Sequence, residues 1–143
     1  VSALQGKHIL LAEDNDLNLE IAEFLLQNAG LRTTAARNGQ EAVTIFAASA
    51  PGTFDAILMD VMMPQLDGYE ATRAIRALDR PDAAAIPIFA MTANAFTEDR
   101  RRAHESGMNE HLTKPLEPDT LLRTRGGPFS SVLLAEGAGR HAQ

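Results

Sequence analysis

Short apolar runs that stop abruptly at polar residues restrict the possible folds of this chain more than any other feature. Each run has the length of a buried strand, and most are followed by apolar residues at helical spacing or by a helix-capping residue. Strands that alternate with helices predict an α/β fold with a doubly wound parallel sheet. The predicted strands cover residues 8–12, 31–36, 56–59, 86–91 and 110–113.

Helices are predicted between these strands. Apolar residues recur at helical spacing from Leu17, namely Leu17, Ile21, Phe24, Leu25 and Ala29, and Gly30 has the position of a C-terminal cap. Asn38, with Glu41 three residues later, resembles a capping box that opens a second helix to about residue 48. The other predicted helices cover residues 69–78, 97–105 and a short 119–123, the last stopped by the Gly-Gly-Pro at 126–128.

The size and charge of the chain narrow its function. Its 143 residues suit one compact domain, which we expect at residues 1–125. For residues 126–143 we expect a tail that is disordered, docks a partner or is foreign to the protein, with the first and last favoured. A formal net charge of −6 gives no basic surface for nucleic acid or an anionic membrane.

Two absences narrow the function further. The chain has no cysteine, which excludes a disulfide framework, a thiolate zinc site and a cysteine nucleophile. No apolar run reaches the roughly 18 to 20 residues that span a bilayer, so a cytoplasmic location without membrane contact by this segment is expected. The sequence begins with Val1 rather than Met, which suggests a piece of a longer protein.

Polar residues gather where the predicted strands end. Glu13 and Asp14 follow the first strand, and Asp60, Thr92 and Lys114 follow the third, fourth and fifth. The carboxyl ends of parallel strands share one edge of a sheet, so these residues are expected to meet in one cleft. Each alone is more often a cap, a turn residue or a surface charge, and only their joint placement favours a functional site.

Three carboxylates that meet in a cleft repel one another unless a cation holds them. Oxygen ligands favour a hard ion, so Mg²⁺ is the predicted cofactor, with Mn²⁺ tolerated. A lysine and a threonine hydroxyl facing the same point would add a charge and a donor for phosphate oxygens.

At these residues the sequence closely resembles the receiver domains of response regulators and hybrid histidine kinases. The matching segments are residues 9–15 (ILLAEDN), 55–68 (DAILMDVMMPQLDG), 90–95 (AMTANA) and 112–115 (LTKP). Each segment is weak evidence alone, but four in order, each on the expected element, are specific. The resemblance implies a flavodoxin-like (βα)5 receiver fold of five parallel strands in the order 2-1-3-4-5.

The resemblance also implies the metal site. Asp60 would accept the phosphoryl group, and Asp14 would bind Mg²⁺ directly. Glu13 would act largely through metal-bound water, and the backbone carbonyl of Met62 would complete the ligands. The side chains of Met62 and Asn94 would flank the site and govern water access.

The remaining roles follow from the same likeness. Lys114 would pair with the phosphoryl group, and Thr92 would move to bind it, so both are predicted to act with Asp60. Receivers commonly have an aromatic switch residue at the position of His111, where a switch role and a solvent-facing side chain both stay open. Pro115 is a cis-proline candidate.

As a receiver, the chain would take its phosphoryl group from a histidine kinase or a histidine phosphotransfer domain. It would catalyse only its own phosphorylation and dephosphorylation. The segments near residues 4–11 and 108–115 resemble receivers fused to hybrid sensor kinases, so the parent would be a protein kinase, with or without a membrane anchor. The short final helix leaves dimerisation in doubt, and a monomer or weak dimer is expected.

Three other functions are compatible with an α/β chain that has an acidic strand end. A phosphatase of the haloacid dehalogenase type would carry a second Asp where this chain has Met62. A flavodoxin-like cofactor carrier would need a phosphate-binding loop after the first strand, where Glu13 and Asp14 would repel phosphate. A pseudo-receiver that docks partners without phosphorylation is the principal alternative, although every acceptor-site residue is present.

Overall fold

The computed structural model describes residues 6–63, 66–92 and 97–113. Five strands form one parallel sheet, in the order β2-β1-β3-β4-β5. The predicted doubly wound sheet and its strand order are therefore confirmed. The strands are β1 (His8–Ala12), β2 (Arg32–Ala36), β3 (Ala56–Asp60), β4 (Ile88–Thr92) and β5 (Glu110–Thr113).

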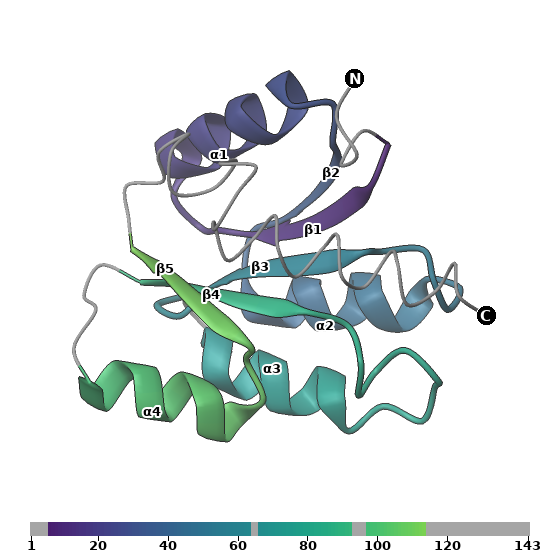
Figure 1. Cartoon of the computed structure of the whole chain (residues 1–143), viewed down its shortest axis with the longest axis vertical. Coiled ribbons are helices and arrows are strands. Elements are labelled where there is room, and N and C mark those ends of the chain that lie inside the picture. The colour runs from purple at the N-terminus through teal and green to yellow at the C-terminus, as the bar shows by residue number, and fades with distance from the viewer. Residues whose placement is uncertain (1–5, 64–65, 93–96, 114–143) are drawn as a thin grey trace.

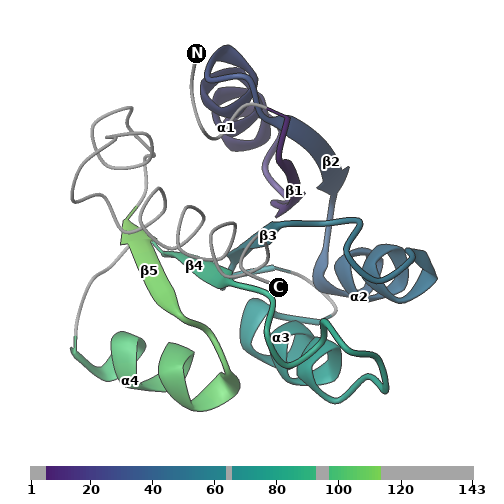
Figure 2. The same cartoon turned by 45° about the vertical axis from the view of Figure 1, so that its right-hand side comes forward.

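Four helices connect the strands, and they lie on both sides of the sheet (Figure 1). The turned view shows α1 against β1 and β2, apart from α2, α3 and α4 (Figure 2). Among the described residues, no helix is long and apolar enough to cross a membrane. The helices are α1 (Asp16–Asn28), α2 (Gly39–Ala48), α3 (Gly68–Arg76) and α4 (Thr97–Ser106).

The alternation of side chains along each strand divides the core into two layers. Leu10 of β1 lies in the layer with Phe46 of α2 and Ile75 of α3. Ile9 of β1 lies in the other layer with Leu26 of α1. The β3 and β4 side chains are buried on both faces, as expected for the central strands of a covered parallel sheet.

The capping residues place the helix starts. The side chain of Asn38 accepts a hydrogen bond of 2.8 Å from the backbone N–H of Glu41, which confirms it as the cap of α2. The Glu41 carboxylate accepts from the backbone N–H of Arg37 at 2.8 Å, one residue earlier than in a standard capping box. Asp67 and Glu70 form a complete capping box at the start of α3 that the sequence analysis did not identify.

The apolar row that predicted α1 faces the sheet only in part, because Leu25 and Ala29 pack half-buried against the core while the other three members are exposed. Leu17, Ile21 and Phe24 are 64%, 38% and 66% exposed. The residues of α1 that are buried are Leu19, Ala22 and Leu26. Both rows have helical spacing, so spacing predicts the helix correctly but does not decide which row packs on the sheet.

Several predictions concern residues outside the described ranges. These are Lys114, Pro115, Asn94, the short helix at 119–123 and the tail at 126–143. They stay predictions of the sequence.

Candidate functional site

Three predicted carboxylates meet at the carboxyl edge of the sheet. One oxygen from each of Glu13, Asp14 and Asp60 lies within 4.8 Å of the other two. Glu13 and Asp60 are almost fully buried, whereas Asp14 is exposed. The cluster arises because β1 and β3 are neighbours, with Ala12 paired to Met59, so the residues after both strands emerge side by side.

Backbone groups orient the two buried carboxylates. The Glu13 carboxylate accepts a hydrogen bond of 3.1 Å from the backbone N–H of Asn15. The Asp60 Oδ1 atom accepts one of 3.2 Å from the backbone N–H of Met62. These bonds fix one oxygen of each carboxylate and turn both side chains toward the shared edge.

The start of α3 lies against the backbone of the acidic strand end. A Cβ atom added to Gly68 would stand 2.3 Å from the carbonyl oxygen of Asp60. The Gly68 N–H also donates to the Val61 carbonyl at 3.2 Å. No side chain fits in this contact, so glycine allows α3 to pack directly on the site.

The donor chemistry of this cluster fits a hard divalent cation. Every donor is a carboxylate oxygen, and two of the three carboxylates are almost fully removed from water. Burial of like charges at such separations is unfavourable, and a bound cation reverses the sign of their interaction. Six-coordinate ions that retain water, such as Mg²⁺, suit a site in which one ligand remains exposed.

Thr92 lies at the same edge, one strand further along. Asp60 pairs with Met91 in the β3–β4 register, and the Val61 N–H donates to the Met91 carbonyl at 3.1 Å. Thr92 is the last residue of β4 and is buried. Thr92 therefore lies beside the end of β3, which carries Asp60, as the sequence predicts. Thr92 pairs in turn with Thr113 of β5, the residue that precedes Lys114.

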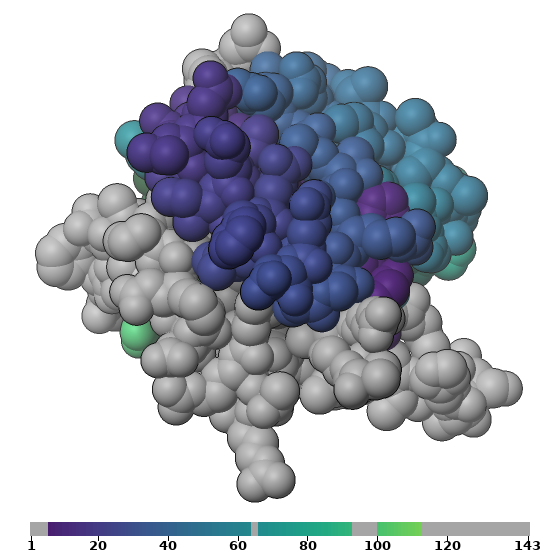
Figure 3. Space-filling model, turned by 90° about the horizontal axis from the view of Figure 1, so that it is seen from above, coloured from purple at the N-terminus to yellow at the C-terminus, as the bar shows by residue number. Residues whose placement is uncertain are grey.

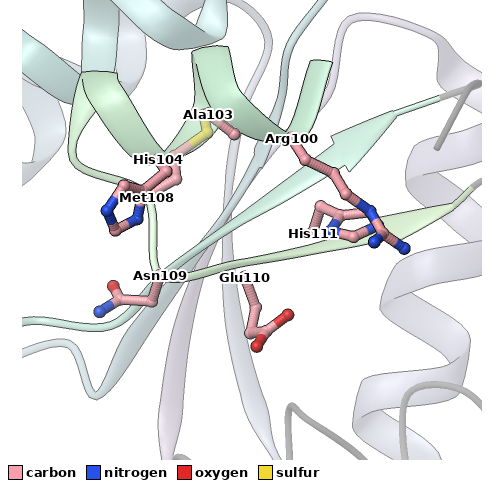
Figure 4. A pocket seen from close by; sticks show the side chains of 7 residues that line it. All are labelled: Arg100, Ala103, His104, Met108, Asn109, Glu110 and His111. Carbon is pink, nitrogen blue, oxygen red and sulfur yellow. The ribbon is translucent and has the colours of Figure 1, made fainter. Parts of the chain in front are cut away.

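His111 of β5 lines a pocket between this strand and α4. The Arg100 Nε atom lies 3.1 Å from the His111 Nε2 atom, in a hydrogen bond that requires the ring nitrogen to accept. Figure 4 shows this pair at one side of the pocket of about 220 Å³, with Met108 and Asn109 at the opposite side. The ring is partly exposed and bonded to α4, so the predicted switch residue links β5 to that helix.

A row of exposed apolar side chains lies near the acidic cluster. Leu17, Ile21 and Phe24 follow one another along the outer surface of α1, which begins two residues after Asp14. The view from above looks onto this helix (Figure 3). Of the large hydrophobic side chains in the described ranges, only these three and Met62 are exposed. Apolar side chains grouped beside a polar site are typical of a docking surface.

A five-stranded parallel sheet with an acidic cluster and a buried threonine at its carboxyl edge defines a receiver-like α/β protein. The family model described as "Response regulator receiver domain" matches residues 9–124. The chain therefore belongs to the response regulator receiver domain family, and it is a receiver domain of two-component signalling.

Curated relatives of the chain include histidine kinases, some of them hybrid kinases by name. It is 39% identical over 122 residues to hybrid signal transduction histidine kinase I of Dictyostelium discoideum, with 84% of this chain and 7% of that protein covered. It is also 39% identical over 113 residues to the sensor protein GacS of Pseudomonas syringae pv. syringae, with 78% and 12% covered. The chain thus spans only a small part of the length of these relatives.

Solved structures show the same fold. The receiver domain of a sensor histidine kinase from Pseudomonas aeruginosa PAO1, with a magnesium ion in its active site cleft, is 42% identical. The TM-score is 0.74, with 82% of this chain and 93% of that chain covered. A Saccharomyces cerevisiae receiver domain, solved in complex with a histidine phosphotransfer protein, is 33% identical with a TM-score of 0.76, and 88% and 92% are covered.

Proposed function

We propose that this receiver accepts a phosphoryl group on Asp60, with Mg²⁺ held by Glu13, Asp14, Asp60 and the backbone carbonyl of Met62. The observation that carries this proposal is the convergence of three carboxylate oxygens within 4.8 Å. Asp60 is the best acceptor of the three, because it ends the central strand and has one oxygen fixed by the Met62 N–H. The magnesium-bound relative supports the choice of ion, and Mn²⁺ would be tolerated.

The reaction would be an in-line transfer from a phosphohistidine. A carboxylate oxygen of Asp60 would form a bond to phosphorus while the phosphorus–nitrogen bond of the donor breaks, leaving an acyl phosphate. A bound Mg²⁺ supplies charge stabilisation to the phosphoryl oxygens. Lys114 would pair with the same oxygens, and Thr92 would donate a hydrogen bond to the product.

The proposed partner is a histidine kinase or a histidine phosphotransfer domain. The donor must bring its phosphohistidine to the acidic cluster, so its docking surface must cover side chains beside that cluster. The exposed row of Leu17, Ile21 and Phe24 offers apolar area in that position. The yeast receiver solved with a phosphotransfer protein supports this class of partner.

The proposal extends to the parent protein. The identities to hybrid kinases support a receiver at residues 1–125 that is one part of a hybrid sensor kinase. We also predict that the receiver is a monomer or weak dimer and that it is located in the cytoplasm. The tail at 126–143 is predicted to be disordered or foreign to the protein. Phosphorylation would shift α4, with Thr92 and His111 as the coupled residues.

Labelling with acetyl phosphate and Mg²⁺ tests the acceptor. We expect the intact protein to gain the mass of one phosphoryl group, Asp60→Asn to gain none, and Asp79→Asn to behave as wild type, since Asp79 is exposed and lies in the connection between α3 and the amino end of β4. Beryllofluoride should bind the wild type only in the presence of Mg²⁺. No mass change and no beryllofluoride binding would leave the pseudo-receiver, which docks partners without phosphorylation, as the function.

A further inference from the structure

The five methionines differ sharply in exposure. Met62 is 75% exposed, while Met63 is 8% exposed. The other three are at most 3% exposed, and they are Met59, Met91 and Met108. Oxidation of a thioether requires contact with the oxidant, so the sulfur of Met62 should react long before the other four.

Met62 is also placed where a change of polarity would matter. Its backbone N–H donates to Asp60 Oδ1 at 3.2 Å, so its Cα lies at the rim of the acidic cluster. β1 and β3 are neighbours, so the loop that carries Met62 shares an edge with Asp14 and the start of α1. A protein that delivers a phosphoryl group to Asp60 would therefore dock next to this exposed residue.

We propose that Met62 is an oxidant-sensitive modification site that controls access of the protein phosphodonor. The oxidant is a peroxide. The sulfur attacks one peroxide oxygen, the oxygen–oxygen bond breaks, and the products are methionine sulfoxide and water, or an alcohol from an organic peroxide. The sulfur loses two electrons and the peroxide gains them.

The effect on signalling rests on the proposed function. A sulfoxide is a strong hydrogen-bond acceptor and binds water, whereas a thioether binds water only weakly. A protein that docks over the sulfoxide must displace this water, which costs free energy. Transfer from a protein donor should therefore slow. A small phosphodonor does not cover the side chain, so its transfer should be unchanged.

The experiment compares two donors before and after peroxide treatment. Hydrogen peroxide is titrated until peptide mass spectrometry shows one added oxygen, which should map to Met62. The untreated and oxidised proteins then react with acetyl phosphate, and with a histidine phosphotransfer domain phosphorylated in vitro. We expect the second-order rate constant for transfer from the protein donor to fall about three- to tenfold on oxidation, while the initial rate of phosphorylation by acetyl phosphate, measured before hydrolysis contributes, stays the same.

Two variants separate the sulfoxide from general damage. Peroxide treatment of Met62→Leu should leave its rate of phosphorylation by either donor the same as before treatment. Met62→Gln carries a permanent polar oxygen near the same place, and it should disfavour the protein donor relative to acetyl phosphate without any peroxide. Both variants keep the backbone groups of residue 62.

Three outcomes would overturn the inference. These are first oxidation at another methionine, an unchanged protein-donor rate in the singly oxidised protein, and equal slowing with both donors. If the untreated protein accepts phosphate from neither donor, the proposed function itself has failed instead. The two failures are thus distinguishable.

Discussion

The two edges of the sheet hold their charged groups in opposite ways. At the carboxyl edge, three carboxylates of like charge lie within 4.8 Å of one another. At the amino edge, the Arg76 guanidinium donates to the carbonyls of Ala83, Ile86 and Gly107 at 2.7 to 3.0 Å. It also donates to Asn109 Oδ1 at 2.9 Å. The carboxyl edge thus brings like charges together, whereas the amino edge surrounds a single positive charge with hydrogen-bond acceptors.

A second arginine repeats the pattern at the amino edge. Arg80 donates to the carbonyls of Phe46 and Ser49 at 2.5 and 2.8 Å, and pairs with Asp82 at 2.6 Å. Burial alone would raise the pKa of Asp82, but hydrogen bonds from Arg80 and Gly52, with the Arg80 charge, hold it below its ordinary value. The arginines at the amino edge satisfy backbone carbonyls, whereas the carboxylates at the carboxyl edge stay available for a ligand.

The largest loss of stability is expected from removing the Arg76 hydrogen bonds at the amino edge. Burial lowers the pKa of its guanidinium, and Arg76→Met would leave several carbonyls without their donor. We expect the free energy of unfolding to fall by about 3 kcal/mol. Urea unfolding measures it, with Arg73→Met as the matched control because Arg73 is exposed on the same helix. Equal losses in both variants would contradict the account of this edge.

Two glycine substitutions compare a contact on the backbone of Asp60 itself with a contact on Leu66, six residues further along the connection to α3. A Cβ on Gly68 would meet the Asp60 carbonyl oxygen at 2.3 Å, and one on Gly39 would meet the Leu66 carbonyl oxygen at 1.9 Å. Each change to alanine should cost about 2 kcal/mol of stability. Only Gly68→Ala should also weaken Mg²⁺ binding, measured by calorimetry. Weakening by Gly39→Ala to the same degree would show that the effect is not local.

Removing one charge from the acidic cluster should change stability in opposite directions with and without metal. In EDTA, Asp14→Asn should raise the melting temperature, because it relieves repulsion with Glu13 and Asp60. In Mg²⁺, the variant should lose about tenfold in metal affinity, or about 1.4 kcal/mol. Thermal unfolding in both buffers checks this, with Asp79→Asn as control. A lower melting temperature in EDTA would mean that the carboxylates do not repel.

The smallest effect is expected at His8, near the amino end of β1. Burial, then the nearby charge of Arg32, lowers the pKa of this imidazole, and its Nε2 lies 2.7 Å from Thr34 Oγ1. A folded-state pKa below the unfolded one favours the neutral ring, so its contribution is complete above the unfolded value of about 6.5. It is lost as the pH falls through the lowered folded pKa. Urea unfolding of His8→Gln should therefore show a weaker loss of stability below pH 6.5 than wild type.

The strands, the sheet order and the acidic cluster could be predicted because their signals are local or come with the family resemblance. The run at 56–59 is apolar throughout and ends on Asp60, which specifies both a buried strand and an acid at its end. Asn38 likewise caps α2 through a bond to a residue three positions away. Such features need no knowledge of the rest of the fold.

The features that could not be predicted depend on segments distant in sequence. The sheet buries Leu19, Ala22 and Leu26 of α1 rather than the equally periodic row at Leu17, and only tertiary packing decides between them. The bonds of Arg76 to residue 107 and of Arg100 to His111 join elements that the chain brings together only when folded. Single residues in a sequence carry no signal for such contacts.

Chemical mapping of the phosphorylated residue shows whether Asp60 is the acceptor and whether it needs Mg²⁺. The protein is incubated with acetyl phosphate and Mg²⁺, reduced with borohydride, which converts an aspartyl phosphate to homoserine, and digested for mass spectrometry. The account predicts homoserine at residue 60 alone, and none when EDTA replaces Mg²⁺. Homoserine at residue 14 or elsewhere, or labelling that persists without a divalent ion, would contradict it.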